Sequence, residues 1–488
     1  MRRLRAPGIF MINMIKMLNH QRITHTLLAL YFLVPFLILP VGRDVYTEWI
    51  FPRMVFVLMF GLTGLLLFRK EILSTNRIVL LASVGYLFLV FLSDFLTPDE
   101  LVFKVVGHEE RYDGFLYQTG KVLAFITALI LVNKQKLPRA YFFIGSGFLT
   151  TAILQAALLA FHLFFNFDVV GELLYEGQKN KIPIGTVGFK VLLILSIGTG
   201  LLYILIQETK AWKAVSIFLA FMAGLAAGRS SAIGLIASLF TGSWWHYRSK
   251  SSSKAIFFLA VVMVFSLAFV FRNQILIPFE VRPITTLSTY TLQTRFLIWK
   301  ISLRLLETHN WLLIQGFGSD AMRYLLIKEL PKDPVLQKLY IRFMIMENRL
   351  PADTVEGLEI VTRKEFGLRA TALHLIYRTR EEPDRTKHFL AAVNLDKAHN
   401  LWLDLWIRYG LFATLLYTLI AFGPLLFSIG DLIKGVLGQW KTRAMLWVSL
   451  VLLAHGIHYL AWFPMPLWEP LFLLIAALGW NLVDNKDT

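Results

Sequence analysis

Long apolar runs constrain the fold of this chain more than any other feature of its sequence. Runs of about 17–25 residues, the length that crosses ~30 Å of hydrocarbon as a helix, recur over most of the chain. Hydrophobic residues fill 56% of the 488 positions, more than a soluble protein of this size can keep from water. The short alternating segments of a membrane β-barrel are missing from the sequence. The pattern therefore predicts an all-α integral membrane protein.

The basic residues predict the orientation of about 12 transmembrane helices. The expected spans are 23–42, 50–68, 77–96, 115–132, 140–165, 186–206, 212–227, 230–246, 254–271, 409–428, 443–462 and 464–483. The two tails and the alternate short connections, which share one side in this topology, carry 20 basic and five acidic residues. The positive-inside rule then places both termini in the cytoplasm. Most of the net charge of +17 is thus a topology signal, and no basic patch with aromatic platforms points to nucleic acid.

The spans leave one long polar segment outside the membrane, which divides the chain into three parts. We expect residues 1–271 to hold nine transmembrane helices, residues 272–408 to form a helical extracytoplasmic (periplasmic) insert, and residues 409–488 to hold three more helices. Within the insert, "LSTYTLQTRFLIWKISLRLLE" predicts an amphipathic helix on or near the membrane surface. Residues 333–349 and 354–380 are expected to be further helices. The chain has no cysteine, which excludes disulfides, thiol nucleophiles and thiolate metal sites.

Four groups of polar residues fall at the expected outer surface, where charges near span ends are functional candidates because the apolar layer penalises them. They are "GHEERYDG" with Arg111, "AAGRSSAIG" with Arg229, "TRFLIWK" with Arg295, and "AHN" with His399 and Asn400. Each has an ordinary explanation as well: a snorkelling arginine, a charge on a solvated helix face, a local salt bridge or a hydrogen-bonded histidine. The combination favours function, because segments far apart in the sequence share one depth.

The residue types indicate a reaction at a phosphate-bearing lipid. Guanidinium forks match phosphate oxygens, and a neutral histidine beside them suits proton removal from a hydroxyl. If Asp396 caps a helix, His399 lies in its first turn, where the helix dipole and the arginines disfavour the imidazolium form. This chemistry predicts group transfer from a lipid pyrophosphate. His455 and His458 have ligand-like spacing, but without carboxylates beside them we expect interhelical hydrogen bonds rather than a metal site.

The same segments resemble the O-antigen ligase and polymerase superfamily. "KAHNLWLDLWIRYG" is similar to the family's AHN signature, and "TRFLIWKISLRLLETHNWLLIQGFG" to its arginine–aromatic segment with a Gly-x-Gly turn. "AAGRSSAIGLIASLF" and "GHEERYDGFLYQTG" resemble two further motifs, and all four occur in the family's order.

The resemblance implies a GT-C-like membrane glycosyltransferase of lipopolysaccharide assembly, metal-independent, inverting and without a cofactor. Such an enzyme moves a glycan from undecaprenyl pyrophosphate to a hydroxyl of lipid A-core or another acceptor, on the outer face of the bacterial cytoplasmic membrane. His399 matches the catalytic histidine of the family. The positions that match its substrate-binding pattern are Arg229, Arg295, Arg111, Asn400, Gly316 and Gly318. Lys190, in "IGTVGFKV", brings a further cation where the family has an asparagine region.

Three alternatives stay open at this point. A polymerase would use another lipid-linked glycan as the acceptor, and the sequence does not separate it from a ligase. A metal-dependent transferase of the C type would use Asp44 in the first external loop. A lipid-linked glycan flippase would place its charges along a cavity at the membrane midplane.

Overall fold

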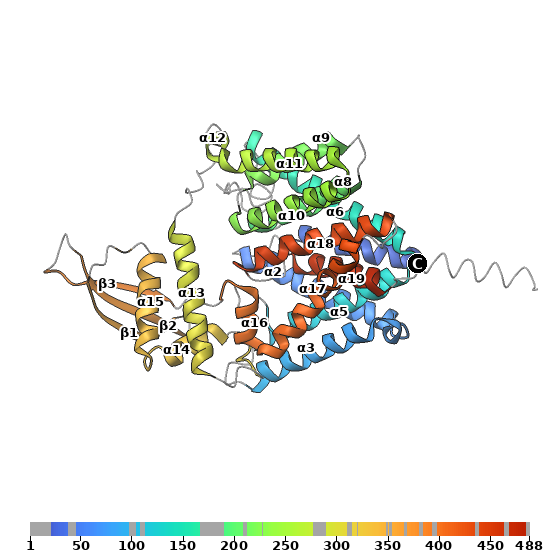
Figure 1. Cartoon of the computed structure of the whole chain (residues 1–488). Helices are drawn as coiled ribbons and strands as arrows, with labels where there is room; N and C mark the ends of the chain where they lie inside the picture. Colours follow the sequence, from blue (N-terminus) through green and yellow to red (C-terminus); the bar gives the residue numbers. More distant parts are fainter. Residues whose placement is uncertain are drawn as a thin grey trace, which may run out of the picture.

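The computed structural model places a smaller lobe of helices and strands at one end of a helical bundle (Figure 1). The residues that it describes are 21–37, 45–96, 104–107, 113–165, 190–207, 212–226, 228–276, 289–309, 315–319, 321–347, 350, 354–365, 368–379, 384–392, 398–434, 439–462 and 468–484.

Helices form the bundle at the positions that the apolar runs predict. Residues 21–31 are helical. The elements that follow are η1 (Val34–Phe36), α2 (Val45–Leu67), η2 (Ile72–Ser74), α3 (Arg77–Leu96), α5 (Phe115–Asn133), α6 (Leu137–Phe164), α8 (Lys190–Gln207), α9 (Lys213–Leu225), α10 (Arg229–Arg248), α11 (Ser252–Val270), α17 (Leu411–Lys434), α18 (Gln439–Tyr459) and α19 (Glu469–Asp484). Each expected span from 50–68 onward overlaps one of these helices.

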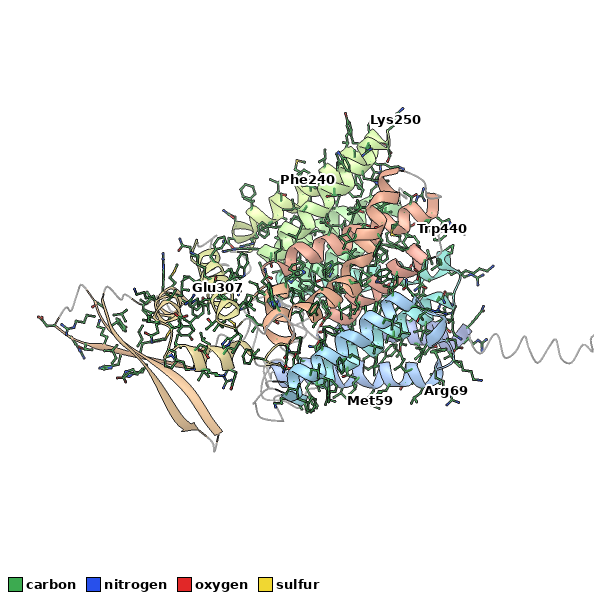
Figure 2. The ribbon with its side chains drawn as sticks, turned by 60° about the horizontal axis from the view of Figure 1, so that its bottom comes forward. Met59, Arg69, Phe240, Lys250, Glu307 and Trp440 are labelled. Carbon is green, nitrogen blue, oxygen red and sulfur yellow. The ribbon has the colours of Figure 1, made fainter. Side chains whose placement is uncertain are left out.

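Six of the described helices are long and apolar enough to cross a membrane. They are Ile50–Leu67, Arg77–Leu96, Phe115–Asn133, Leu137–Phe164, Ser252–Val270 and Leu411–Gly430. Large apolar side chains also face outward, such as Met59 at 58% and Phe240 at 50% exposed (Figure 2). Exposing such a surface to lipid costs no free energy, whereas exposing it to water is unfavourable. The chain is therefore a multi-pass membrane protein by its apolar helices.

The first expected span, 23–42, is interrupted within its described part. Pro35 lies in the first turn of η1, because proline has no N–H to continue the helix before it. The carbonyl groups of Pro35 and Leu37 instead accept hydrogen bonds from the buried Arg53 of α2, at 2.9 and 3.0 Å. An arginine inside the bundle thus satisfies backbone groups that the break leaves without helical partners.

The N-terminal and C-terminal membrane helices pack into one bundle. α2 and α19 both pack on α5, α17 packs on α3, and α10 packs on α18. A Cβ atom on Gly234 of α10 would overlap the carbonyl oxygen of Ala454 in α18, so glycine permits this close crossing. One cluster of buried apolar side chains extends from Leu27 to Leu482. Residues 409–488 therefore complete the core that residues 1–271 begin.

The insert has a smaller core of its own. Its elements are α12 (Arg272–Leu276), α13 (Thr289–Thr308), α14 (Ala321–Glu329), α15 (Pro334–Glu347), β1 (Thr354–Glu365), β2 (Leu368–Arg378), β3 (Lys387–Ala392) and α16 (Leu401–Tyr409). Leu305 of α13, Leu326 of α14, Tyr340 of α15 and Leu375 of β2 meet in its centre. The predicted amphipathic helix is confirmed as α13, and the helix expected at 333–349 as α15.

The expectation of a purely helical insert is wrong for residues 354–380. This segment and β3 form an antiparallel sheet of order β1-β2-β3, in which Glu359 pairs with His374 and Ile376 with His388. In β2, Leu375 and Tyr377 are buried while their neighbours are less so, which is the two-residue period of a strand. Only two residues separate β1 from β2 in the sequence, the length of a hairpin connection. The protein is mostly helical rather than all-α.

The absence of cysteine makes the two ends of the bundle testable by single-cysteine labelling. Figure 2 shows Arg69, Lys250 and Trp440 at the end of the bundle far from Glu307. We expect a membrane-impermeant maleimide to label Glu307→Cys in spheroplasts, but Arg69→Cys and Lys250→Cys only after lysis. Labelling of all three in detergent is the control. Equal labelling of Lys250→Cys and Glu307→Cys in sealed spheroplasts would contradict this topology.

Candidate functional site

Trp462, just beyond the end of α18, joins two of the residues that the sequence singles out. The guanidinium carbon of Arg295 lies 5.3 Å from the centre of the indole ring. The imidazole of His399 lies 5.4 Å from it, tilted by 58°. Burial lowers the pKa of Arg295 to about 10, so the side chain remains a cation at neutral pH. A base and a permanent cation from separate segments therefore share one aromatic neighbour.

His399 has an uncommon backbone conformation that its neighbour helps to maintain. Its φ of 50° lies in the left-handed region, which costs a residue with a side chain about 1–2 kcal/mol. Asn400 caps α16, since its Oδ1 accepts from the N–H groups of Trp402 and Leu403 at 3.1 and 3.2 Å. Its Nδ2 donates to the carbonyl of Leu460 at 2.9 Å. Asn400 thus fixes the start of α16 to the end of α18, close to Trp462.

This geometry corrects the expected cap. The N-cap of α16 is Asn400 rather than Asp396, which lies outside the described residues, so His399 precedes the helix instead of lying in its first turn. The hydrogen bonds that Asn400 makes serve the local fold. Asn400 therefore positions the neighbouring His399 through the backbone.

Arg229 begins α10, and the residues after it reach the same region through His458. The hydroxyl groups of Ser230 and Ser231 lie 3.0 and 3.1 Å from Nδ1 of His458. The ring of His458 lies 6.4 Å from that of Trp462. The start of α10, the end of α18 and the AHN segment are therefore neighbours.

The expected interhelical hydrogen bonds of His455 and His458 are confirmed. His458 bonds to α10 as above, and Nε2 of His455 accepts from the indole N–H of Trp468 at 2.9 Å. Among the described residues, no group of three or more potential ligands could hold a metal ion.

The two turn glycines pack on α16 rather than on His399. A Cβ atom on Gly316 would overlap the carbonyl of Arg408, and Gly318 has a φ of 85°, which favours glycine. The N–H groups of Phe317 and Gly318 donate to the carbonyls of Ile407 and Arg408 at 3.0 and 2.7 Å. The Gly-x-Gly turn therefore holds the C-terminal end of α16.

Two further predicted residues are not placed. Arg111 lies outside the described residues. Lys190 is described only as the first residue of α8.

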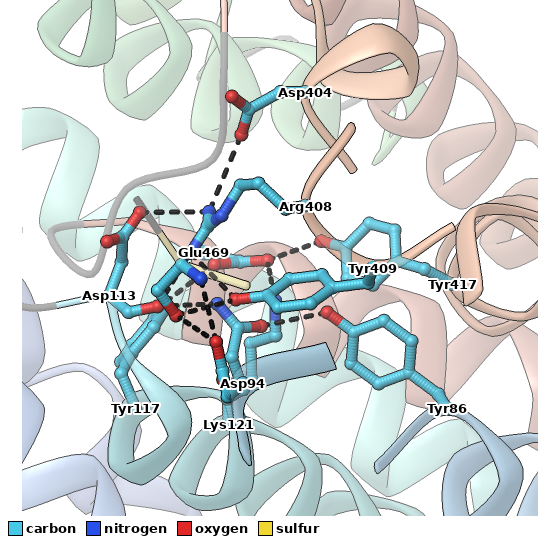
Figure 3. A network of polar contacts seen from close by, with 12 residues as sticks. Tyr86, Asp94, Asp113, Tyr117, Lys121, Asp404, Arg408, Tyr409, Tyr417 and Glu469 are labelled. Carbon is cyan, nitrogen blue, oxygen red and sulfur yellow. Dashed lines mark hydrogen bonds and ion pairs between the residues drawn. The ribbon is translucent and has the colours of Figure 1, made fainter. Parts of the chain in front are cut away.

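A buried network of charges, which the sequence analysis missed, joins α16 to the bundle (Figure 3). Nη1 of Arg408 lies 3.0 Å from Oδ2 of Asp113 and 3.4 Å from Oδ2 of Asp404. Nη2 donates to the backbone carbonyl of Asp113 at 2.9 Å and to the hydroxyl of Tyr409 at 2.7 Å. These ionic side chains are at most 7% exposed, so only this close geometry offsets their desolvation.

A second buried pair lies deeper in the bundle. Nζ of Lys121 is 3.0 Å from Oε1 of Glu469, with side-chain exposures of 2% and 1%. The hydroxyl of Tyr117 donates to Oε2 of Glu469 at 2.6 Å, and that of Tyr417 donates to Oε1. The contact ties α5, α17 and α19 together. Both charges fall within expected spans, 115–132 and 464–483, and that position was the signal that could have found them.

Comparison with known proteins adds no relative, since no protein-family model matches the chain and no curated protein is similar to it.

The Lys121–Glu469 pair predicts a strong dependence of stability on charge balance. Lys121→Met leaves the Glu469 carboxylate buried without its cation, and we expect a loss of about 3–5 kcal/mol. Adding Glu469→Gln should restore most of the melting temperature, measured by fluorescence-detected size exclusion after heating. The exposed Lys213→Met is the control and should change stability by less than about 0.5 kcal/mol. A double variant as unstable as Lys121→Met alone would show that the pair is not the stabilising unit.

The cap predicts a different result at Asn400. Asn400→Ala removes both the cap and the bond to Leu460 and should destabilise the protein by about 1 kcal/mol or more. Asn400→Asp keeps the acceptor oxygen for Trp402 and Leu403, so most of the stability should remain in the same melting assay. Equal losses in the two variants would mean that the cap contributes little.

Proposed function

We propose that the protein is a membrane glycosyltransferase that transfers a glycan from undecaprenyl pyrophosphate to an acceptor hydroxyl, in the manner of an O-antigen ligase. The observation that carries this proposal is the joint contact of His399 and Arg295 with Trp462, next to the end of the bundle where α10 begins with Arg229. A lone arginine or histidine at a membrane surface has many explanations. A base and cations held together on three separate segments fit a reaction at an anionic headgroup.

The proposed reaction needs one base and a cationic site for the leaving group. The acceptor oxygen attacks the anomeric carbon as His399 takes the hydroxyl proton, and the bond from that carbon to the pyrophosphate oxygen breaks. Undecaprenyl pyrophosphate leaves with the electron pair of that bond. Arg295 and Arg229 stabilise the negative charge that grows on the leaving oxygen. Attack from the face opposite the leaving group inverts the anomeric centre.

The proposal places the reaction on the outer face of the bacterial cytoplasmic membrane. The lobe with α13, α14, α15 and the sheet lies at one end of the bundle, and basic residues such as Arg69 and Lys250 lie at the other (Figures 1 and 2). By the positive-inside rule the basic end faces the cytoplasm, with both termini there. The insert between α13 and α16 then faces the compartment from which an acceptor glycolipid would approach.

Reconstitution of the purified protein with an undecaprenyl-pyrophosphate glycan and candidate acceptors tests this function, with products identified by mass spectrometry. Transfer of the whole glycan to a second acceptor supports a ligase, whereas a ladder of lengthening lipid-linked glycan indicates a polymerase. A protein that consumes no donor in micelles but moves it across vesicle membranes would be a transporter instead.

His399 is expected to be essential for transfer. His399→Ala should lower the rate about 100-fold or more while leaving the elution profile and melting temperature unchanged. His374→Ala, on the sheet of the insert, is the matched histidine control and should keep full activity. Transfer at the wild-type rate by folded His399→Ala protein would refute the base assignment.

On α13, Arg295→Gln and Arg304→Gln form a second matched pair. Arg304 is bound to Asp333 at 2.7 Å and lies away from Trp462. We expect only Arg295→Gln to weaken use of the donor, about tenfold or more in kcat/KM. Similar losses in both variants would indicate a defect of the insert rather than of donor binding.

A further inference from the structure

Arg272, the first residue of α12, is a buried cation without an anionic partner in the described structure. Its side chain is only 5% exposed. The guanidinium carbon lies 4.6 Å from the ring centre of Phe269, and within the described ranges Nη1 has no hydrogen-bond partner. A buried arginine without a carboxylate is costly, because desolvation is not offset by an opposite charge. The sequence analysis gave this residue no role.

A second arginine lies close to Arg272. A Cβ atom on Gly224 would lie 2.6 Å from the carbonyl oxygen of Phe265 and 3.1 Å from the N–H nitrogen of Phe269, so the end of α9 presses on the last turns of α11. The short connection from α9 therefore starts α10, with Arg229, beside the end of α11, where Arg272 follows. Burial lowers the pKa of Arg272, and the charge of Arg229 lowers it further.

The start of α10 adds hydrogen-bond donors and partial positive charge to the two arginines. Gly228 is the N-cap and has no side chain to accept from the first N–H groups of this 20-residue helix. The positive end of the helix dipole and the hydroxyl groups of Ser230 and Ser231 lie there as well. Two like charges beside a helix N-terminus make this place strongly positive, which favours the binding of an anion. A tetrahedral oxyanion has enough acceptor oxygens to meet two guanidinium forks and the helix.

We propose that Arg272 and Arg229, together with the N-terminus of α10, bind one phosphate group of a diphosphate. The identity of the lipid that carries the diphosphate rests on the proposed function. The binding of the diphosphate itself does not. Arg295, which lies over Trp462, is then left for the second phosphate. The site should therefore prefer a diphosphate to a monophosphate, because a monophosphate cannot engage both groups of cations.

Binding of small probes to the purified full-length protein in detergent tests this assignment without turnover. The probes are inorganic phosphate, inorganic pyrophosphate and a short isoprenyl diphosphate, measured by titration calorimetry. We expect pyrophosphate to bind more tightly than phosphate, and Arg272→Gln to weaken pyrophosphate binding about 10- to 100-fold and to remove the preference. Arg272→Lys should retain part of the affinity. Arg248→Gln, at the opposite end of α10, is the matched control and should bind as the wild type does.

The melting temperature separates a binding role from a structural one. Arg272→Met should raise the melting temperature of the ligand-free protein, because it removes an uncompensated buried charge, and should abolish the stabilisation by pyrophosphate. A lower ligand-free melting temperature with an unchanged pyrophosphate shift would overturn the proposal, as would a wild-type protein that binds none of the probes. Tighter binding of the isoprenyl diphosphate than of pyrophosphate identifies a lipid headgroup as the ligand, and equal binding identifies the free anion.

These outcomes are independent of those for the proposed function. A protein that binds pyrophosphate through Arg272 but transfers no glycan retains the phosphate site and refutes the transferase. If the Arg272→Gln protein transfers glycan at the wild-type rate with an unchanged donor KM, the transferase is retained and the phosphate site at Arg272 is refuted.

Discussion

The contact between Arg408 and Asp113 is the interaction on which the geometry of the candidate site depends. Arg408 lies near the C-terminal end of α16, whose N-terminal cap is the residue after His399. The Gly-x-Gly turn packs on the carbonyl of the same arginine, and Ser319 at the end of that turn donates to Asp94 of α3 at 2.7 and 2.9 Å. The short helix α16 thus acquires a fixed position from charges buried where it meets the bundle. This contact holds the C-terminal end of α16, while the bond from Asn400 to Leu460 holds its N-terminal end beside Trp462.

The cost of buried charge explains why this anchor is rigid. Each ionic group in the network needs a close partner, and a shift of either partner leaves an uncompensated charge. The same reasoning applies below it, where Lys121 and Glu469 join three helices with the help of Tyr117 and Tyr417. Apolar packing alone would allow many similar arrangements of helices in lipid. Paired charges restrict the packing to arrangements in which both partners meet, as Lys121 of α5 and Glu469 of α19 do.

The sequence predicted the parts of this fold that depend on local pattern. An apolar run of membrane length forms a helix whatever its neighbours are, so α2 to α11 and α17 to α19 appear where the runs predict them. The sheet was missed because residues 354–380 carry too many polar residues for either period to dominate. The cap was assigned to Asp396 because aspartate and asparagine cap equally well, and Leu460, far along the chain, favours Asn400. The contact of Arg408 with Asp113 was missed for the same reason, since the two residues are 295 positions apart and meet only in the folded chain.

Three buried arginines show how the same physical cost leads to different roles. Arg53 donates to backbone carbonyls near a proline, and Arg408 contacts two carboxylates, so the fold supplies polar partners for both. Arg272 has neither kind of partner among the described residues and faces another cation. A membrane protein gains nothing structural from such a residue, because methionine would pack as well without the desolvation cost. We infer that an anion from outside the chain supplies the opposite charge that the described residues do not.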